Sequence, residues 1–223
     1  MQCCDMKYSD IRKLDVIDKD GDKVGSVMDC VFDCRNNKIE LKQFIIGGGM
    51  VEELLESLGA RPDVDPLCDL DHIDSINDVI RLNVGRDSLK NAIEAGSIPE
   101  GYRKFSDISK IKVVDSDDLE VGNVIDVWFD KDSKMWLVLG GGFLEEILEK
   151  IKAQPDIDLL VPPEIIECVD EKTIKLTRTR FQLESTCEDE YDKFKRQVAG
   201  GKPSDDARYP SLRLGTGHSR GLV

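Results

Sequence analysis

The sequence predicts a mainly β protein with short helices, built from two homologous small antiparallel domains in tandem and followed by an extended C-terminal tail. The segment KYSDIRKLDVIDKDGDKVGSVMDCVFD (7–33) aligns without a gap with KFSDISKIKVVDSDDLEVGNVIDVWFD (104–130), and direct comparison of the two strings gives 14 identities in 27 positions. Apolar and polar residues alternate in both copies, as expected for β-strands. An internal repeat of this length indicates two units that share one fold.

The repeat continues beyond these segments. After a four-residue shortening of the second copy, FIIGGGMVEELLESLGARPDVDPL (44–67) matches LVLGGGFLEEILEKIKAQPDIDLL (137–160). The segments HIDSINDVIRLN and IIECVDEKTIKLT then close the two copies. We therefore predict four parts: a first domain at 1–94, a linker at 95–103, a second domain at 104–184, and a short helix with an extended tail at 185–223.

The periodicity of the repeat assigns its elements. In KVGSVMDCVFD (23–33) we expect Met28, Cys30 and Phe32 to share one face of a strand, because side chains alternate with a period of two. Apolar residues recur at the same places in the second copy, so we predict that this face belongs to the core: Ile125, Val127 and Phe129. Apolar residues at helical spacing predict one short amphipathic helix per copy, at 50–59 and 143–152.

The stretch DKDGDKVGSVMD (18–29) has carboxylates on alternate residues, as a calcium loop does. An EF-hand loop needs glycine at its sixth position, where this stretch has Lys23. The second copy lacks the glycine and has Leu119 in place of Asp22. Asp-Gly between alternating apolar runs is typical of a two-residue hairpin turn. We predict a hairpin here and no metal site in the chain.

Three consecutive glycines, 47–49 and 140–142, lie between a predicted strand and a predicted helix in each copy. Helix-terminal amides at such a place can bind phosphate. No Lys, Ser or Thr follows as in a P-loop, and acidic residues occupy the first helical turn of both copies. We predict a tight backbone turn instead.

The seven cysteines are odd in number and irregularly spaced, so we predict free thiols: Cys3, Cys4, Cys30, Cys34, Cys68, Cys168 and Cys187. Cys30 and Cys34 would lie about 13 Å apart in one extended strand, too far to share a zinc ion. The two histidines, His72 and His218, have no catalytic motif around them. We therefore expect no catalytic residues, no cofactor, no small-molecule substrate and no enzymatic activity.

The composition is strongly acidic. The formal net charge is −14, from 31 basic and 45 acidic residues, and such a surface repels phosphate backbones. We therefore expect no direct nucleic-acid partner. No apolar run is long enough to span a bilayer, and the start MQCCDMKYSD has no signal-peptide pattern. The predicted location is the cytoplasm, including the periphery of a membrane complex.

The C-terminal segment differs from the rest of the chain. CEDEYDKFKRQVAGG (187–201) predicts a charged helix, and KPSDDARYPSLRLGTGHSRGLV (202–223) has too few apolar residues to form a core of its own. Beyond Asp206 the segment carries arginines and no acid, on an otherwise acidic protein. We predict that it binds a protein partner through guanidinium and apolar anchors: Arg208, Tyr209, Leu212, Arg213, Leu214 and Arg220. The alternative is that the tail folds back onto its own domains.

Several of these features resemble the PRC-barrel family, whose small β-barrel is named after the cytoplasmic domain of the photosynthetic reaction centre H subunit. The resemblance lies in the Ser-Asp-Ile segments, the Val-Gly-x-Val-x-Asp strands (24–29 and 121–126), and the closing strands VIRL and TIKL. LLVPPEIIECVDEKTIKL in the second copy also resembles the closing pattern of the family, whereas Asp69 and Leu70 replace its prolines in the first copy. The resemblance implies two PRC-type barrels in tandem and suggests an archaeal source.

Members of this family resemble one another as adaptors, in reaction-centre H, in the ribosome-maturation factor RimM and in archaeal cell-division proteins. The resemblance therefore implies a non-catalytic adaptor or regulatory subunit that docks on a larger protein assembly, such as the cytoplasmic face of a membrane complex, through its C-terminal tail. One alternative is an archaeal cell-division or ribosome-maturation adaptor that uses its barrel surfaces. A different alternative is a thiol-based redox sensor, which requires an exposed cysteine of low pKa.

Overall fold

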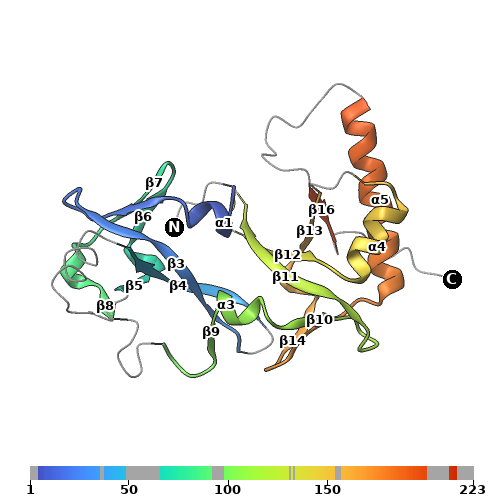
Figure 1. The fold of residues 1–223 in the computed structure, drawn as a ribbon, viewed down its shortest axis with the longest axis horizontal. Helices are drawn as coiled ribbons and strands as arrows, with labels where there is room; N and C mark the ends of the chain where they lie inside the picture. The colour runs from blue at the N-terminus through green and yellow to red at the C-terminus, as the bar shows by residue number, and fades with distance from the viewer. Residues whose placement is uncertain are drawn as a thin grey trace. The chain divides into compact units, whose positions relative to one another are not determined.

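The computed structural model describes residues 5–35, 38–48, 66–91, 98–130, 132, 134–153, 157–199 and 211–214. The fold is mainly β with a few helices, as predicted (Figure 1). Its contacts divide the chain into two compact units. The first unit contains Met1–Ile108 and Val127–Met135, and the second contains Ser109–Asp126 and Trp136–Val223.

The first sheet is built mainly from the first copy of the repeat. Its strands, in sequence order, are β2 (Asp15–Ile17), β3 (Lys23–Asp33), β4 (Glu40–Gly47), β5 (Pro66–Asp69), β6 (Ile73–Ile76), β7 (Val79–Leu82) and β8 (Lys90–Asn91). In space they follow the order β6-β7-β2-β3-β4-β5-β8. A further strand, β9 (Tyr102–Lys104), pairs with β3 outside this path.

The second sheet repeats this order. Its strands are β10 (Lys112–Val114), β11 (Glu120–Phe129), β12 (Met135–Gly140), β13 (Asp158–Val161), β14 (Ile166–Val169), β15 (Thr173–Leu176) and β16 (Ser211–Arg213). They follow the order β14-β15-β10-β11-β12-β13-β16, and β1 (Met6–Lys7) pairs with β11 outside the path. Six strands of each sheet thus share one order, whereas the last edge strands differ, since β8 runs antiparallel and β16 parallel to its neighbour.

The predicted framework was antiparallel throughout, and this part of the prediction is wrong. The strands β2 and β7 run parallel, as do their counterparts β10 and β15. Each pair joins the beginning of a repeat to its closing strand, which returns to the same edge of the sheet in the same direction. The described strands form open paths from one edge to the other, and no closed barrel is seen among them.

The described helices are short except for the last. They are α1 (Tyr8–Ile11), α3 (Phe105–Ile108), α4 (Phe143–Lys150) and α5 (Arg180–Ala199), with single 3-10 turns η1 (Leu70–His72), η2 (Arg86–Ser88) and η3 (Pro163–Ile165). The predicted helix at 143–152 is confirmed by α4. Its predicted counterpart at 50–59 lies outside the described residues. The predicted charged helix begins earlier than expected, because α5 starts at Arg180.

The face predicted for the core is only partly correct. Cys30 and Phe32 are fully buried, but Met28 is 50 % exposed, and its counterpart Ile125 is 57 % exposed. The pairing of β3 with β4 shifts between Val27 and Asp29, so the strand has a β-bulge at Met28. A bulge inserts one extra residue and changes which face the following side chains occupy. A strict period of two cannot predict this change.

The glycine of the Val-Gly-x-Val-x-Asp strand allows two backbones to approach closely. A Cβ on Gly25 would lie 2.5 Å from the carbonyl oxygen of Gly47, and a Cβ on Gly122 would lie 2.6 Å from that of Gly140. In each copy the first glycine of the run, Gly47 or Gly140, thus lies at this close contact between two strands. Gly48, Gly141 and Gly142 have positive φ angles, as expected for the predicted tight turn.

The first strands of the two copies pair reciprocally, and both pairings lie within the first unit. β1 pairs with the end of β11, with Met6 opposite Phe129. β9 pairs with the end of β3, with Arg103 opposite Phe32. These two pairs of residues occupy equivalent positions in the repeat, so each copy donates its first strand to the long strand of the other.

The same reciprocal relation extends to side chains. Tyr8 and Phe105 are equivalent residues of the repeat, and their rings meet edge to face with centroids 4.8 Å apart. The carboxylate of Asp29, the last residue of the repeated strand motif, accepts a hydrogen bond from the backbone N–H of Ser106 in α3 at 3.3 Å. The Val-Gly-x-Val-x-Asp strand of the first copy therefore also holds the beginning of the second copy.

Candidate docking site at the C-terminal strand

The C-terminal strand β16 lies at the end of the second sheet, beside β13. The two strands run parallel, with Leu159 opposite Leu212 and Leu160 opposite Arg213. The backbone N–H of Leu214 donates a hydrogen bond to the carbonyl oxygen of Leu160 at 2.8 Å. Main-chain pairing therefore fixes the position of β16 on the edge of β13.

Side chains fix it further. Leu212 on β16 and Leu214 directly after it are 1 % and 0 % exposed, respectively. Arg213 is exposed, and its guanidinium carbon lies 5.0 Å from the ring centroid of Trp136 on β12. A cation at this distance is attracted to the face of an indole ring. The strand thus has two buried apolar anchors and one cation held on an aromatic ring.

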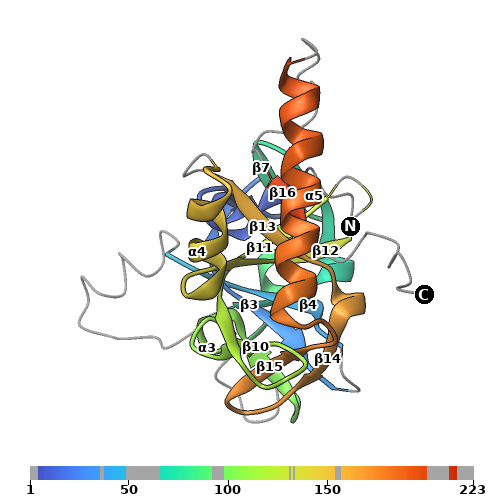
Figure 2. The same cartoon turned by 90° about the vertical axis from the view of Figure 1, so that its right-hand side faces the viewer.

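The long helix α5 helps to form the place that β16 occupies. Leu183, Cys187 and Tyr191 recur at every fourth position and are buried, so one stripe of the helix faces the second unit. The hydroxyl of Tyr191 donates a hydrogen bond to the carbonyl oxygen of Lys152 at 2.9 Å. Figure 2 shows α5 running beside β16, and the two elements are in contact.

The structure places three of the six predicted partner-binding residues on this strand or directly after it. Leu212 and Leu214 are buried against their own chain, whereas Arg213 lies at the surface. The other three lie outside the described residues: Arg208, Tyr209 and Arg220. Of the two alternatives for the tail, residues 211–214 therefore follow the one in which the tail folds back. In this conformation the two leucines are not available to a partner.

The sequence did not predict the surface on which the tail strand packs. Leu-Arg-Leu has the apolar alternation of a half-buried strand, and this signal was present in the tail. Because three residues are too short a pattern to distinguish a strand from an irregular segment, the tail was not expected to form one. Nothing in the sequence indicated that Trp136 and the edge of β13 would receive it.

The stretch that resembles a calcium loop forms the predicted hairpin, because β2 and β3 pair antiparallel. The connection contains five residues, 18–22, rather than the two-residue turn expected from Asp-Gly. Asp18 uses its carboxylate inside the turn: Oδ1 accepts hydrogen bonds from the backbone N–H groups of Asp20 and Asp22 at 2.9 and 3.0 Å. Its Oδ2 accepts from the N–H of Arg86 at 3.3 Å.

Burial alone would raise the pKa of Asp18, but the hydrogen bonds from the backbone N–H groups together lower it below its ordinary value. Asp115 in the second copy has the same three kinds of partner. These carboxylates therefore hold the backbone of their own turns. Within the described ranges, no group of three or more acidic, histidine or cysteine side chains is arranged to bind a metal ion.

The described cysteines have free thiols, as predicted. Burial raises the pKa of Cys34 to about 11, and it raises the pKa of both Cys68 and Cys187 to about 12. A thiol with such a pKa has almost no thiolate at neutral pH, and the thiolate is the reactive form. Cys3 and Cys4 lie outside the described residues.

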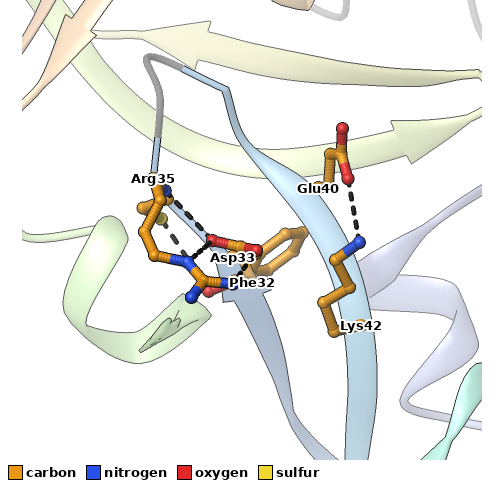
Figure 3. Close-up of polar contacts among 6 residues, drawn as sticks. Phe32, Asp33, Arg35, Glu40 and Lys42 are labelled. Atoms are coloured by element: carbon orange, nitrogen blue, oxygen red, sulfur yellow. Dashed lines mark hydrogen bonds and ion pairs between the residues drawn. The ribbon is translucent and has the colours of Figure 1, made fainter. Parts of the chain in front are cut away.

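A polar cluster lies at the end of the β3–β4 hairpin (Figure 3). Asp33 and Arg35 form two parallel hydrogen bonds, with Nε to Oδ1 at 2.8 Å and Nη2 to Oδ2 at 2.6 Å. The guanidinium carbon of Arg35 lies 5.0 Å from the ring centroid of Tyr102, which is opposite Asp33 in β9. Glu40 and Lys42 form a second ion pair beside it on β4. The side-chain hydrogen bonds from Arg35 lower the pKa of Asp33 to about 2.

The ion pair between Asp33 and Arg35 leads to a testable prediction about the pKa of Asp33. Replacing Arg35 with alanine is expected to move the pKa of Asp33 from about 2 towards its ordinary value of 3.8. Because folding lowers this pKa, the pair contributes stability above pH 3.8 that is lost as the pH falls towards 2. The check is an NMR titration of the Asp33 carboxyl carbon in both proteins. Lys42→Ala is the control, and equal midpoints in the wild type and Arg35→Ala would contradict the prediction.

Comparison with known protein families gives a match to the first copy of the repeat. The sequence model of the PRC-barrel domain family matches residues 5–89. This part of the chain is a PRC-barrel domain. The PRC-barrel domain includes β1 to β7 and the turn carboxylate Asp18. A search of curated proteins finds no match to the chain. No helix within the described residues is both long and apolar enough to span a membrane.

Proposed function

We propose that this protein is a non-catalytic adaptor or regulatory subunit that docks on a larger protein assembly through its C-terminal tail. The pairing of β16 with β13 carries this proposal. β16 is held on the second sheet, and three of the predicted anchors flank it in the sequence: Arg208, Tyr209 and Arg220.

The family of the first copy supports the same class of function, because PRC-barrel domains often mediate protein interactions. We further propose that residues 104–184 form a second domain of this type. The 14 identities in 27 positions and the shared strand order support it. So does the turn carboxylate, since Asp115 repeats the hydrogen bonds of Asp18. A cytoplasmic location, including the face of a membrane complex, belongs to this proposal.

A second candidate is an adaptor of the cell-division or ribosome-maturation kind that uses domain surfaces instead of the tail. Met28 and Ile125 favour it, because they occupy equivalent positions in the repeat and their side chains are 50 % and 57 % exposed, respectively. Apolar side chains that remain exposed on the surface are available to a partner. A thiol sensor has less support, since burial raises the pKa of Cys34, Cys68 and Cys187.

Co-purification from the native host distinguishes these candidates. The tagged full chain is compared with the triple variant Arg208→Ala/Tyr209→Ala/Arg220→Ala, which leaves β16 intact. We expect this variant to recover at least tenfold less of the main partner, because it lacks its guanidinium and aromatic anchors. The matched control is Met28→Ser/Ile125→Ser. If the control loses the partner and the tail variant keeps it, the docking surface lies on the domains and the tail proposal is wrong.

A further inference from the structure

We propose that the edge of β13 is an acceptor site for an extended segment of a partner protein with an apolar–basic–apolar sequence, and that β16 is the competitor built into the chain. The acceptor site comprises the backbone of β13 (Asp158–Val161), the ring of Trp136, and the surfaces that cover Leu212 and Leu214. This inference rests on the proposed adaptor function and names the kind of segment that the adaptor binds.

The backbone of the acceptor site recognises a strand without regard to its sequence. β13 pairs antiparallel with β12 on one side and parallel with β16 on the other. The pairing with β16 covers only Ser211–Arg213, continued by the hydrogen bond from Leu214 to Leu160. Addition of a strand to a sheet edge is a common mode of peptide recognition, in which main-chain hydrogen bonds give affinity.

The side chains of the acceptor site give specificity. Its surfaces leave Leu212 and Leu214 only 1 % and 0 % exposed, so they fit apolar residues at alternate positions. Trp136 holds the intervening cation at 5.0 Å on the opposite side of the strand. The net charge of −14 attracts a basic segment towards the chain as a whole. The chemistry of the occupant is therefore defined by what already occupies the site.

The comparison of the two sheets supports an exchangeable occupant. In the first sheet the equivalent strand β5 is covered by β8, a two-residue strand that runs antiparallel to it. In the second sheet β13 is covered by β16, which comes from a different part of the chain and runs parallel. The repeat itself therefore does not supply the strand that covers β13, and the equivalent edges of the two sheets are covered by strands of different origin and opposite direction.

The built-in competitor sets the conditions for exchange. A tethered segment acts at an effective concentration on the order of millimolar, so a free peptide of the same sequence binds the intact chain weakly. A second copy of this chain offers only the identical sequence and faces the same competition. A partner with a longer or better fitting segment can displace β16, which would release the tail.

Direct binding of a synthetic peptide tests the inference. The probe is fluorescent YPSLRLGTG, residues 209–217, measured by anisotropy against the full chain and its Leu212→Asp/Leu214→Asp variant. We expect at least tenfold tighter binding to the variant, because its own strand no longer competes. The same peptide with both leucines replaced by aspartate is the control and should not bind. Circular dichroism checks that the variant is folded, and Leu212→Ser/Leu214→Ser is the milder replacement.

Absence of binding to a folded variant, or equal binding to both proteins, would overturn the inference. If neither variant folds, the wild-type chain is used with millimolar peptide that carries a photo-crosslinker at the position of Ser211. Crosslinks to 158–161 are then expected, and crosslinks elsewhere would overturn it. Concentration-dependent dimers of the wild type at micromolar concentration would assign the site to a second copy instead. None of these readouts involves the native partner, so they can fail while the co-purification result stands.

Discussion

Replacing Asp115 with alanine is expected to lower the free energy of unfolding by about 3 kcal/mol, because it removes three hydrogen bonds that each contribute about 1 kcal/mol net. Asp115 is fully buried. Its Oδ1 accepts hydrogen bonds from the N–H groups of Asp117 and Leu119, both at 2.9 Å, and its Oδ2 accepts from that of Arg180 at 2.8 Å. One carboxylate thus ties the β10–β11 turn to the start of α5.

Denaturant unfolding of purified variants measures this effect. Asp117→Ala is the matched control, since Asp117 lies exposed in the same turn and its loss is expected to change stability by no more than about 0.5 kcal/mol. Asp115→Asn should fall between the two, because it keeps one acceptor oxygen and adds a donor that has no use there. Equal midpoints for Asp115→Ala and Asp117→Ala would show that the carboxylate does not hold the turn.

Replacing Gly25 with alanine is expected to destabilise the protein by about 3 kcal/mol, at the upper end of the cost of adding a methyl group to a packed site. The new Cβ would lie 2.5 Å from the carbonyl oxygen of Gly47 and 3.1 Å from a methyl group of Ile46. The closest atom belongs to the backbone of β4, so no side chain can move aside. The central pairing of β3 with β4 would have to shift.

Gly85→Ala is the control for this substitution. Its Cβ would meet only the end of the Lys19 side chain at 3.5 Å and a carboxylate oxygen of Asp20 at 3.8 Å, which are ordinary contacts, and its φ angle of −76° suits alanine. Thermal unfolding of both variants gives the comparison. If Gly25→Ala retained the melting temperature of Gly85→Ala, the close approach of the two strands would not be a constraint on the fold.

The sequence by itself determined the repeat, the mainly β character, the first hairpin and the helix α4. Each of these depends on interactions between residues close together in the chain, and alternation or helical spacing records them directly. The glycine runs were also predicted correctly as turns, since positive φ angles favour glycine locally. The identity of the first copy as a PRC-barrel domain follows from the same local motifs.

The tertiary structure alone decided three other features. The bulge at Met28 reverses the side-chain alternation, because β3 must stay paired with β4 while it bends. The reciprocal pairing of β1 with β11 and β9 with β3 joins residues far apart in the chain, such as Met6 with Phe129 and Phe32 with Arg103. Hydrophobic alternation in a two- or three-residue strand does not specify its partner.

For the candidate docking site, too, the sequence determined one part and the tertiary structure decided the other. The sequence predicted Leu212, Arg213 and Leu214 as partner-binding anchors by their chemistry, whereas the structure buries the two leucines against their own chain. The sequence left open what they would contact, because burial depends on the surface that the rest of the chain provides. That surface is the edge of β13 with Trp136 and α5, and it exists only after the second sheet has formed. Side-chain type thus determined what can bind, and tertiary packing decided where.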